Sequence, residues 1–244
     1  MQLTIMGRYG PYPDVGGACS GYLLQEEDHP WLLECGNGVL SRLQKYLDPW
    51  HLQNIIVSHL HADHMADLLI MRYAMDIAQN RGVTDKSLDV YLPDEPEEER
   101  ARIAFKQAYR LHSLNSDVNL NLGPFKLSFL PVKHPLPSVA VKIESKGKTM
   151  VYSGDTEFMP ELIDFVHGAD LFLCEANFQQ EEIDASKGNH LSAGQAAQIA
   201  AEAGVKRLIL THLPAFKDLS ISLQEAEKYY PGAELAVEET TIEI

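Results

Sequence analysis

The sequence predicts an α/β protein, and three observations support that class. Segments with strand periodicity and segments with helix periodicity alternate along all 244 residues. No linker or low-complexity segment separates one half of the chain from the other. Apolar side chains make up 45% of the residues, which is enough for one substantial core. We therefore expect a single domain that spans residues 1–244.

The first fifty residues predict three strands and a helix around a loop rich in glycine and proline. Apolar and β-branched residues mark the strands, and glycine or proline marks the breaks between them. Pro49 ends the helix because a proline cannot continue it. The predicted elements are a strand at 3–6, the loop at 7–17, strands at 21–24 and 31–34, and a helix at 39–47.

The next sixty residues predict a buried strand, a helix, a second strand and a second helix. The buried strand is apolar up to Ser58 and runs directly into a group of histidines. The second helix begins with glutamates, which complement the positive end of a helix dipole. The predicted elements are strand 55–58, helix 66–81, strand 89–92 and helix 97–111.

The second half of the chain continues the alternation, and several of its strands end at a histidine or an acidic residue. Lys146-Gly147-Lys148 predicts a hairpin turn, and Ser192 with Gln195 predicts a capping box at the start of a helix. The predicted elements are strand 126–130, hairpin strands 139–144 and 149–153, helix 159–166, strand 171–174, a helix from the capping box to 203, and strand 206–211.

The residues that follow strand 55–58 predict a metal site. His59, His61, Asp63 and His64 are four potential ligands within six positions. His59 and His61 are two apart and share a face, whereas Asp63 and His64 are adjacent and point in different directions. Two directions indicate two metals. Nitrogen-rich ligands with one carboxylate suit zinc, and the ligand types also admit manganese or iron.

This H-x-H-x-D-H run, followed along the chain by His134, Asp155 and His212, resembles the signature of the metallo-β-lactamase-fold superfamily. The resemblance implies a four-layer αββα sandwich and two metal ions. It assigns His59, His61 and His134 to one ion, assigns Asp63, His64 and His212 to the other, and makes Asp155 the bridge between them. The expected nucleophile is a hydroxide that bridges the metals, and Asp63 would help to orient this hydroxide.

Finer features are similar to one branch of that superfamily. The segments 152–156, 174–178 and 189–197 resemble blocks of ribonuclease Z and related phosphodiesterases. By that resemblance His190 would donate a proton to the leaving oxygen, oriented by Glu175. From the residues alone, His190 could instead be a loop histidine that precedes a helix cap. The dizinc β-lactamases resemble the chain less, since they usually have a cysteine in the place of Asp155.

Two departures from ribonuclease Z change the expected substrate. His134 and Asp155 are only 21 residues apart, and the hairpin fills that interval, so the arm that grips tRNA in ribonuclease Z has no room there. The loop at 10–14 also lacks the Lys/Arg-Asn pattern found in ribonuclease Z. The net charge of −15, from 35 acidic and 20 basic side chains, likewise disfavours extended nucleic acid as a partner. We therefore expect a phosphodiesterase with two zinc ions that acts on a small anionic phosphodiester.

Other functions fit the same residues. A hydroxide shared by two metals also attacks carbonyl carbon, so a thioester or lactone hydrolase is one alternative. A second is a tRNA 3′-processing endonuclease that acts without the arm. A third is a nucleotide- or metal-binding module with an incomplete site. Assays on each substrate class, together with metal analysis, separate these alternatives.

The remaining features predict location and assembly. Cys19, Cys35 and Cys174 are odd in number and far apart, which favours reduced, buried thiols. No apolar stretch approaches the ~20 residues of a membrane span, and residues 1–5 lack the pattern of a secretory signal. We therefore expect a cytoplasmic protein without membrane contacts. Relatives in the resembled branch are often dimers, so we also expect a homodimer.

Overall fold

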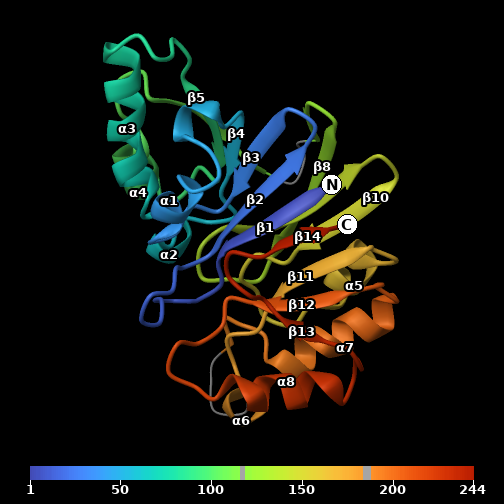
Figure 1. The fold of residues 1–244 in the computed structure, drawn as a ribbon. Coiled ribbons are helices and arrows are strands. Elements are labelled where there is room, and N and C mark those ends of the chain that lie inside the picture. Colours follow the sequence, from blue (N-terminus) through green and yellow to red (C-terminus); the bar gives the residue numbers. More distant parts are fainter. Residues whose placement is uncertain (116–118, 184–187) are drawn as a thin grey trace.

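A computed structural model describes residues 1–115, 119–183 and 188–244. Within these residues the chain forms two seven-stranded sheets that face each other (Figure 1). Helices from the first half cover the outer side of one sheet, and helices from the second half cover the outer side of the other (Figure 1). This arrangement is the four-layer αββα sandwich that the family resemblance predicted.

The first sheet contains the N-terminal strands and is antiparallel at one side and parallel at the other. β1, β2 and β3 form an antiparallel meander, and β3 to β6 pair in parallel. The C-terminal strand pairs with β1 and so joins the end of the chain to its beginning. In sheet order the strands are β14 (Thr241–Glu243), β1 (Gln2–Gly7), β2 (Gly21–Glu26), β3 (His29–Leu33), β4 (Asn54–Ile56), β5 (Leu88–Leu92) and β6 (Tyr109–Ser113).

The second sheet has the same mixed character. β7 to β10 are antiparallel and β10 to β13 are parallel. The predicted hairpin is confirmed: Lys146 and Gly147 connect β9 and β10 with φ of 50° and 77°, the left-handed pair that suits a two-residue turn. In sheet order the strands are β13 (Glu234–Leu235), β12 (Leu208–Thr211), β11 (Leu171–Glu175), β10 (Lys148–Tyr152), β9 (Ser138–Ser145), β8 (Phe125–Val132) and β7 (Leu120–Leu122).

The helices are short and lie on the outer sides of the sheets (Figure 1). No helix in the described part of the chain is long and apolar enough to cross a membrane. In the first half they are α1 (Val39–Leu43), the 3₁₀ turn η1 (Pro49–His51), α2 (Ala62–Met65), α3 (Leu68–Asn80) and α4 (Glu97–Ile103). In the second half they are α5 (Pro160–Val166), α6 (Gln180–Ile183), α7 (Ala193–Ala203) and α8 (Leu219–Glu227).

Strand periodicity creates the layers. Successive side chains of a strand point to opposite faces, so neighbours in the sequence enter different cores. Tyr22 and Trp31 pack in the core between the two sheets, whereas Leu23 and Leu32 pack in the core under α1 and α3. A third core lies between the second sheet and α5, α7 and α8. The three cysteines are buried as free thiols, as predicted.

Some predicted elements were wrong in extent or type. The helix expected at 97–111 ends at Ile103, and Tyr109–Ser113 forms β6, which pairs in parallel with β5. Lys106 adopts a left-handed φ of 46° between them, which a continuous helix does not allow. The helix expected at 39–47 ends at Leu43. The helix expected at 66–81 is preceded by α2 and begins at Leu68.

Candidate metal centre

The predicted donors follow strands of both sheets and meet at one place. His59 lies three residues beyond β4, and His61 is the residue before α2, which carries Asp63 and His64. From the second sheet, His134 follows β8, Asp155 follows β10 and His212 directly follows β12. The fold therefore brings together side chains that are up to about 150 residues apart in the sequence, as in the contact between His212 and Asp63.

Three imidazoles form the first group. His61 Nδ1 lies 3.1 Å from His59 Nε2 and 3.0 Å from His134 Nε2. One nitrogen from each ring lies within 4.8 Å of the others, close enough for a shared metal ion. Burial lowers the pKa of His134 to about 4, and burial also lowers the pKa of His59 and His61. These rings are therefore neutral at pH 7, the form that binds a metal.

Asp63, His64 and His212 form the second group, again with donor atoms within 4.8 Å of one another. His212 Nε2 lies 3.0 Å from Asp63 Oδ2, and His64 Nε2 lies 3.5 Å from the same oxygen. Both histidines are fully buried. The sequence predicted the same grouping, and the role of these residues as ligands stays a prediction.

Asp155 lies between the two groups. Its Oδ2 is 3.7 Å from His59 Nε2 of the first group and 3.3 Å from both His64 Nε2 and His212 Nε2 of the second. Burial raises the pKa of the Asp155 carboxyl, but the surrounding imidazoles outweigh burial and hold this pKa well below its usual range. The ionised carboxylate therefore lies near both groups, and its role as a bridging ligand stays a prediction.

Several buried polar atoms of this centre lack a hydrogen-bond partner among the described residues. They are both ring nitrogens of His64 and Oδ1 of Asp155. Burial lowers the pKa of His64, but the nearby carboxylates, Asp155 first among them, raise it well above the usual value. A buried polar atom without a partner is costly, and a field that attracts a proton also attracts a metal cation. The donor set therefore fits divalent metal ions.

His190 borders the centre from the loop before α7. Its Nδ1 lies 3.1 Å and 3.2 Å from the two oxygens of Glu175, a fully buried carboxyl at the end of β11. Burial lowers the pKa of His190, but Glu175 outweighs burial and raises that pKa to about 9. Asp155 Oδ2 is 3.9 Å from His190 Nδ1. The pair predicted from the sequence is thus in contact and faces the donors.

Further residues support the donors and were not predicted from the sequence. The Asn189 carbonyl accepts a hydrogen bond from His134 Nδ1 at 3.1 Å, which leaves Nε2 for a metal. Glu34 is fully buried, accepts from the backbone N–H of Ser58, and lies 3.4 Å from His64 Nδ1. Only Glu34 had a signal in the sequence, because it ends a predicted strand next to the conspicuous Gly36-Asn37-Gly38 turn.

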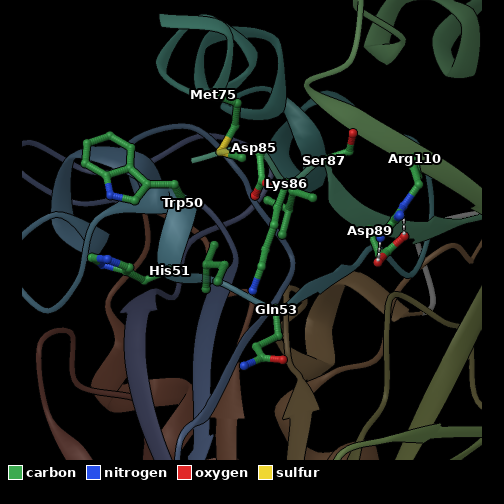
Figure 2. A pocket seen from close by; sticks show the side chains of 11 residues that line it. Trp50, His51, Gln53, Met75, Asp85, Lys86, Ser87, Asp89 and Arg110 are labelled. Atoms are coloured by element: carbon green, nitrogen blue, oxygen red, sulfur yellow. Dashed lines mark hydrogen bonds and ion pairs between the residues drawn. The ribbon is translucent and has the colours of Figure 1, made fainter. Parts of the chain in front are cut away.

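A polar hollow elsewhere on the molecule does not contain the predicted donors. Figure 2 shows this cavity of about 760 Å³, with Trp50 and His51 on one side and Arg110 on the other. The Arg110 guanidinium makes hydrogen bonds of 2.8 Å and 2.6 Å to the Asp89 carboxylate (Figure 2). The hollow lies at the N-terminal ends of β4 and β5, whereas the donors follow the C-terminal ends of strands. Ligand sites of parallel sheets usually lie at the latter ends.

Comparison with known proteins agrees with this geometry. Residues 30–213 match the family described as the beta-lactamase superfamily domain. YhfI of Bacillus subtilis (strain 168), a probable metallo-hydrolase, is 33% identical over 232 residues, which are 95% of this chain and 95% of the relative. The crystal structure of YhfI has a TM-score of 0.94 and 32% identity, and the match covers 99% of this chain and 98% of that chain.

More distant relatives include ribonucleases. The alignment with ribonuclease Z of Ignicoccus hospitalis is 26% identical over its length of 298 residues, gaps included, and it covers 100% of this chain and 98% of the relative. The crystal structure of the short form of human tRNase Z has a TM-score of 0.80, covers 100% of this chain and 99% of that chain, and is 22% identical. At that identity the second comparison shows a shared fold alone.

Proposed function

This chain belongs to the beta-lactamase superfamily, and from that premise we propose that it is a phosphodiesterase that uses two zinc ions. The resemblance inferred from the H-x-H-x-D-H run is confirmed by the family match. The family and the donor groups together imply a divalent metal. The number of ions, their identity as zinc and the phosphodiester substrate are the proposed parts.

In this proposal His59, His61 and His134 hold one ion, and Asp63, His64 and His212 hold the other, with Asp155 shared. When bound, the two ions supply an activated water at neutral pH and stabilise negative charge on the phosphoryl group. The buried carboxylates of Asp63 and Asp155 lie among the donors, and their negative charge favours cations there.

The contact between His190 and Glu175 is the observation that carries the choice of a phosphodiester. Glu175 engages His190 Nδ1 at 3.1 Å, so Nε2 is the nitrogen that remains to hold a proton toward a substrate. An alkoxide that leaves phosphorus is strongly basic and needs a proton from such a donor. Asp63, at the edge of the donor set, helps to orient the attacking water. The ribonucleases among the relatives support this choice, because a ribonuclease cleaves phosphodiesters.

Metal analysis and hydrolysis of bis-(p-nitrophenyl) phosphate test the proposal. We expect about two zinc ions per purified chain, and we expect Asp63→Ala to abolish hydrolysis. Fewer than one ion per chain, or full activity in Asp63→Ala, would contradict it. Parallel assays on S-acyl glutathione and on acyl-homoserine lactone complete the test. Preferred hydrolysis of either compound would assign the centre to carbonyl chemistry instead.

The role of His190 is tested by the leaving group. p-Nitrophenolate leaves without accepting a proton, whereas a methoxide or a ribose alkoxide needs a proton in order to leave. His190→Ala should therefore lower kcat for a diester with a poor leaving group by about 10²–10⁴-fold and affect the p-nitrophenyl ester much less. An equal loss on both substrates would show that His190 does not donate the proton.

A further inference from the structure

We propose that an apolar hollow beside the metal centre receives the non-leaving substituent of the substrate, and that this substituent is uncharged and aliphatic. The inference rests on the proposed function and specifies its substrate class. The hollow has a volume of about 490 Å³. Its walls include Leu60, Met65, Ala66, Leu69 and Leu136.

The hollow is directly joined to the metal centre. His61, a member of the first donor group, is itself part of the wall. Leu60 precedes His61, Met65 follows His64, and Leu136 lies two residues beyond His134. The same short segments therefore hold the donors and form the apolar surface. A substrate whose phosphorus lies at the centre has this surface within reach of one of its two substituents.

The direction of the hollow identifies which substituent enters it. The His134 ring contacts both of its neighbours, with ring centroids 4.9 Å from His61 and 5.5 Å from His190. His61 lines the hollow, whereas His190, the proposed proton donor, does not. Since His190 serves the leaving oxygen, the substituent that stays on phosphorus extends toward His61. This geometry makes the hollow a site for the non-leaving group.

Charge beyond the hollow excludes an anionic substituent. Glu99 and Arg102 lie at its rim and neutralise each other through contacts of 2.7 Å and 3.0 Å. Leu136 also lines a neighbouring hollow, whose wall has four acidic residues against a single arginine, Arg100. Those acids are Asp94, Glu95, Glu97 and Glu98. A second phosphate or a carboxylate on the substituent would meet this negative field.

Three esters with the same leaving group test the inference. They are the methyl, pentyl and 4-carboxybutyl esters of p-nitrophenyl phosphate, which differ only in the non-leaving group. We expect kcat/KM of the pentyl ester to exceed that of the methyl ester by about tenfold or more, because four further methylene-sized groups leave water. The carboxybutyl ester should be poorer than the pentyl ester by a similar factor. Equal rates for all three would overturn the inference.

Substitutions in the wall locate the effect. Ala66→Phe fills the hollow and should reduce the pentyl-to-methyl ratio of kcat/KM to near one, and Leu136→Ala should reduce it in part. Two variants are needed because either one alone could disturb the fold. The matched control is Ile70→Phe, which places the same ring on the exposed outer side of α3, where Ile70 is 58% exposed. A ratio that survives both wall substitutions, or that falls equally in the control, would contradict the site.

A binding measurement separates this inference from the proposed function. Calorimetric titration of the purified metalloprotein with methylphosphonate and with pentylphosphonate requires no turnover. If none of the esters is hydrolysed but pentylphosphonate binds about tenfold more tightly, and Ala66→Phe removes the difference, the apolar site stands and the phosphodiesterase proposal fails. If the esters are hydrolysed but the two phosphonates bind equally, the phosphodiesterase proposal stands and the apolar site fails.

Discussion

At the scale of single residues, Gly10 gives the sharpest prediction. A Cβ atom at this position would lie 1.9 Å from Nε2 of His212, and the Gly10 backbone is fixed by a hydrogen bond from its N–H to the Leu213 carbonyl. Gly10→Ala must therefore displace the His212 ring. We expect the loss of about one metal ion per chain and of most hydrolysis, measured by elemental analysis and by kcat. Gly194→Ala is the matched control, because its nearest neighbours are 3.3–3.7 Å away. Retained metal in Gly10→Ala would contradict the argument.

The same residue illustrates what the sequence can predict about the site. The donors were found because chemistry restricts their types and because each follows an apolar strand. Gly10 and Asn177 have no such signal. Asn177 Nδ2 donates to the carbonyls of Gly10 and His212 at 2.8 Å and 3.1 Å, across 167 and 35 residues of sequence. Contacts of this kind depend on tertiary placement, which a single sequence does not contain.

At the scale of elements, the start of α7 links stability to the position of His190. Ser192 Oγ accepts from the Gln195 N–H, and Gln195 Oε1 accepts from the Ser192 N–H, both at 3.1 Å. Ser192→Ala should lower the free energy of unfolding by about 1–2 kcal/mol in urea titrations. It should also lower kcat on diesters with a poor leaving group, because His190 is two residues away.

Asp218→Ala is the matched control. It removes the cap of α8, where Asp218 Oδ1 accepts from the Ser220 N–H at 3.0 Å, and it should lower stability alone. Equal kcat losses in both variants would show that the cap does not position His190.

Elements were predictable where local signals agree with the tertiary structure. The capping box and the Lys146-Gly147 turn were both predicted, because their hydrogen bonds or dihedral angles are local. β6 was missed because its first three residues, up to Leu111, continue an apparently helical pattern. Its strand conformation depends on pairing with β5, in which Val90 lies beside Leu111. Parallel pairing joins segments that are distant in sequence, so tertiary context overrides local preference there.

At the scale of the whole molecule, the layers could not be derived from periodicity alone. An alternation of strands and helices is compatible with one sheet or with two, and the two-sheet arrangement was expected only from the family resemblance. The structure shows why two sheets form. Tyr22 and Tyr152 come from different sheets and pack together with ring centroids 5.3 Å apart, inside a core between the sheets. The metal centre lies where donors of both halves meet.

That location predicts that metal removal weakens the whole molecule. His59, His61, Asp63 and His64 belong to the first half, and the remaining donors to the second, so bound ions connect the two halves. Without them, buried polar atoms such as the His64 ring nitrogens and Oδ1 of Asp155 have no hydrogen-bond partner among the described residues. Each ion that binds only the folded chain adds about 4 kcal/mol to the free energy of unfolding when its concentration is 1,000 times Kd. For a chain of this size we expect chelation to lower the unfolding temperature, measured by calorimetry, by roughly 10 °C or more. We expect Asp63→Ala to bind fewer ions and therefore to show a smaller shift. An unchanged unfolding temperature in protein shown to be free of metal would mean that the centre does not connect the two halves.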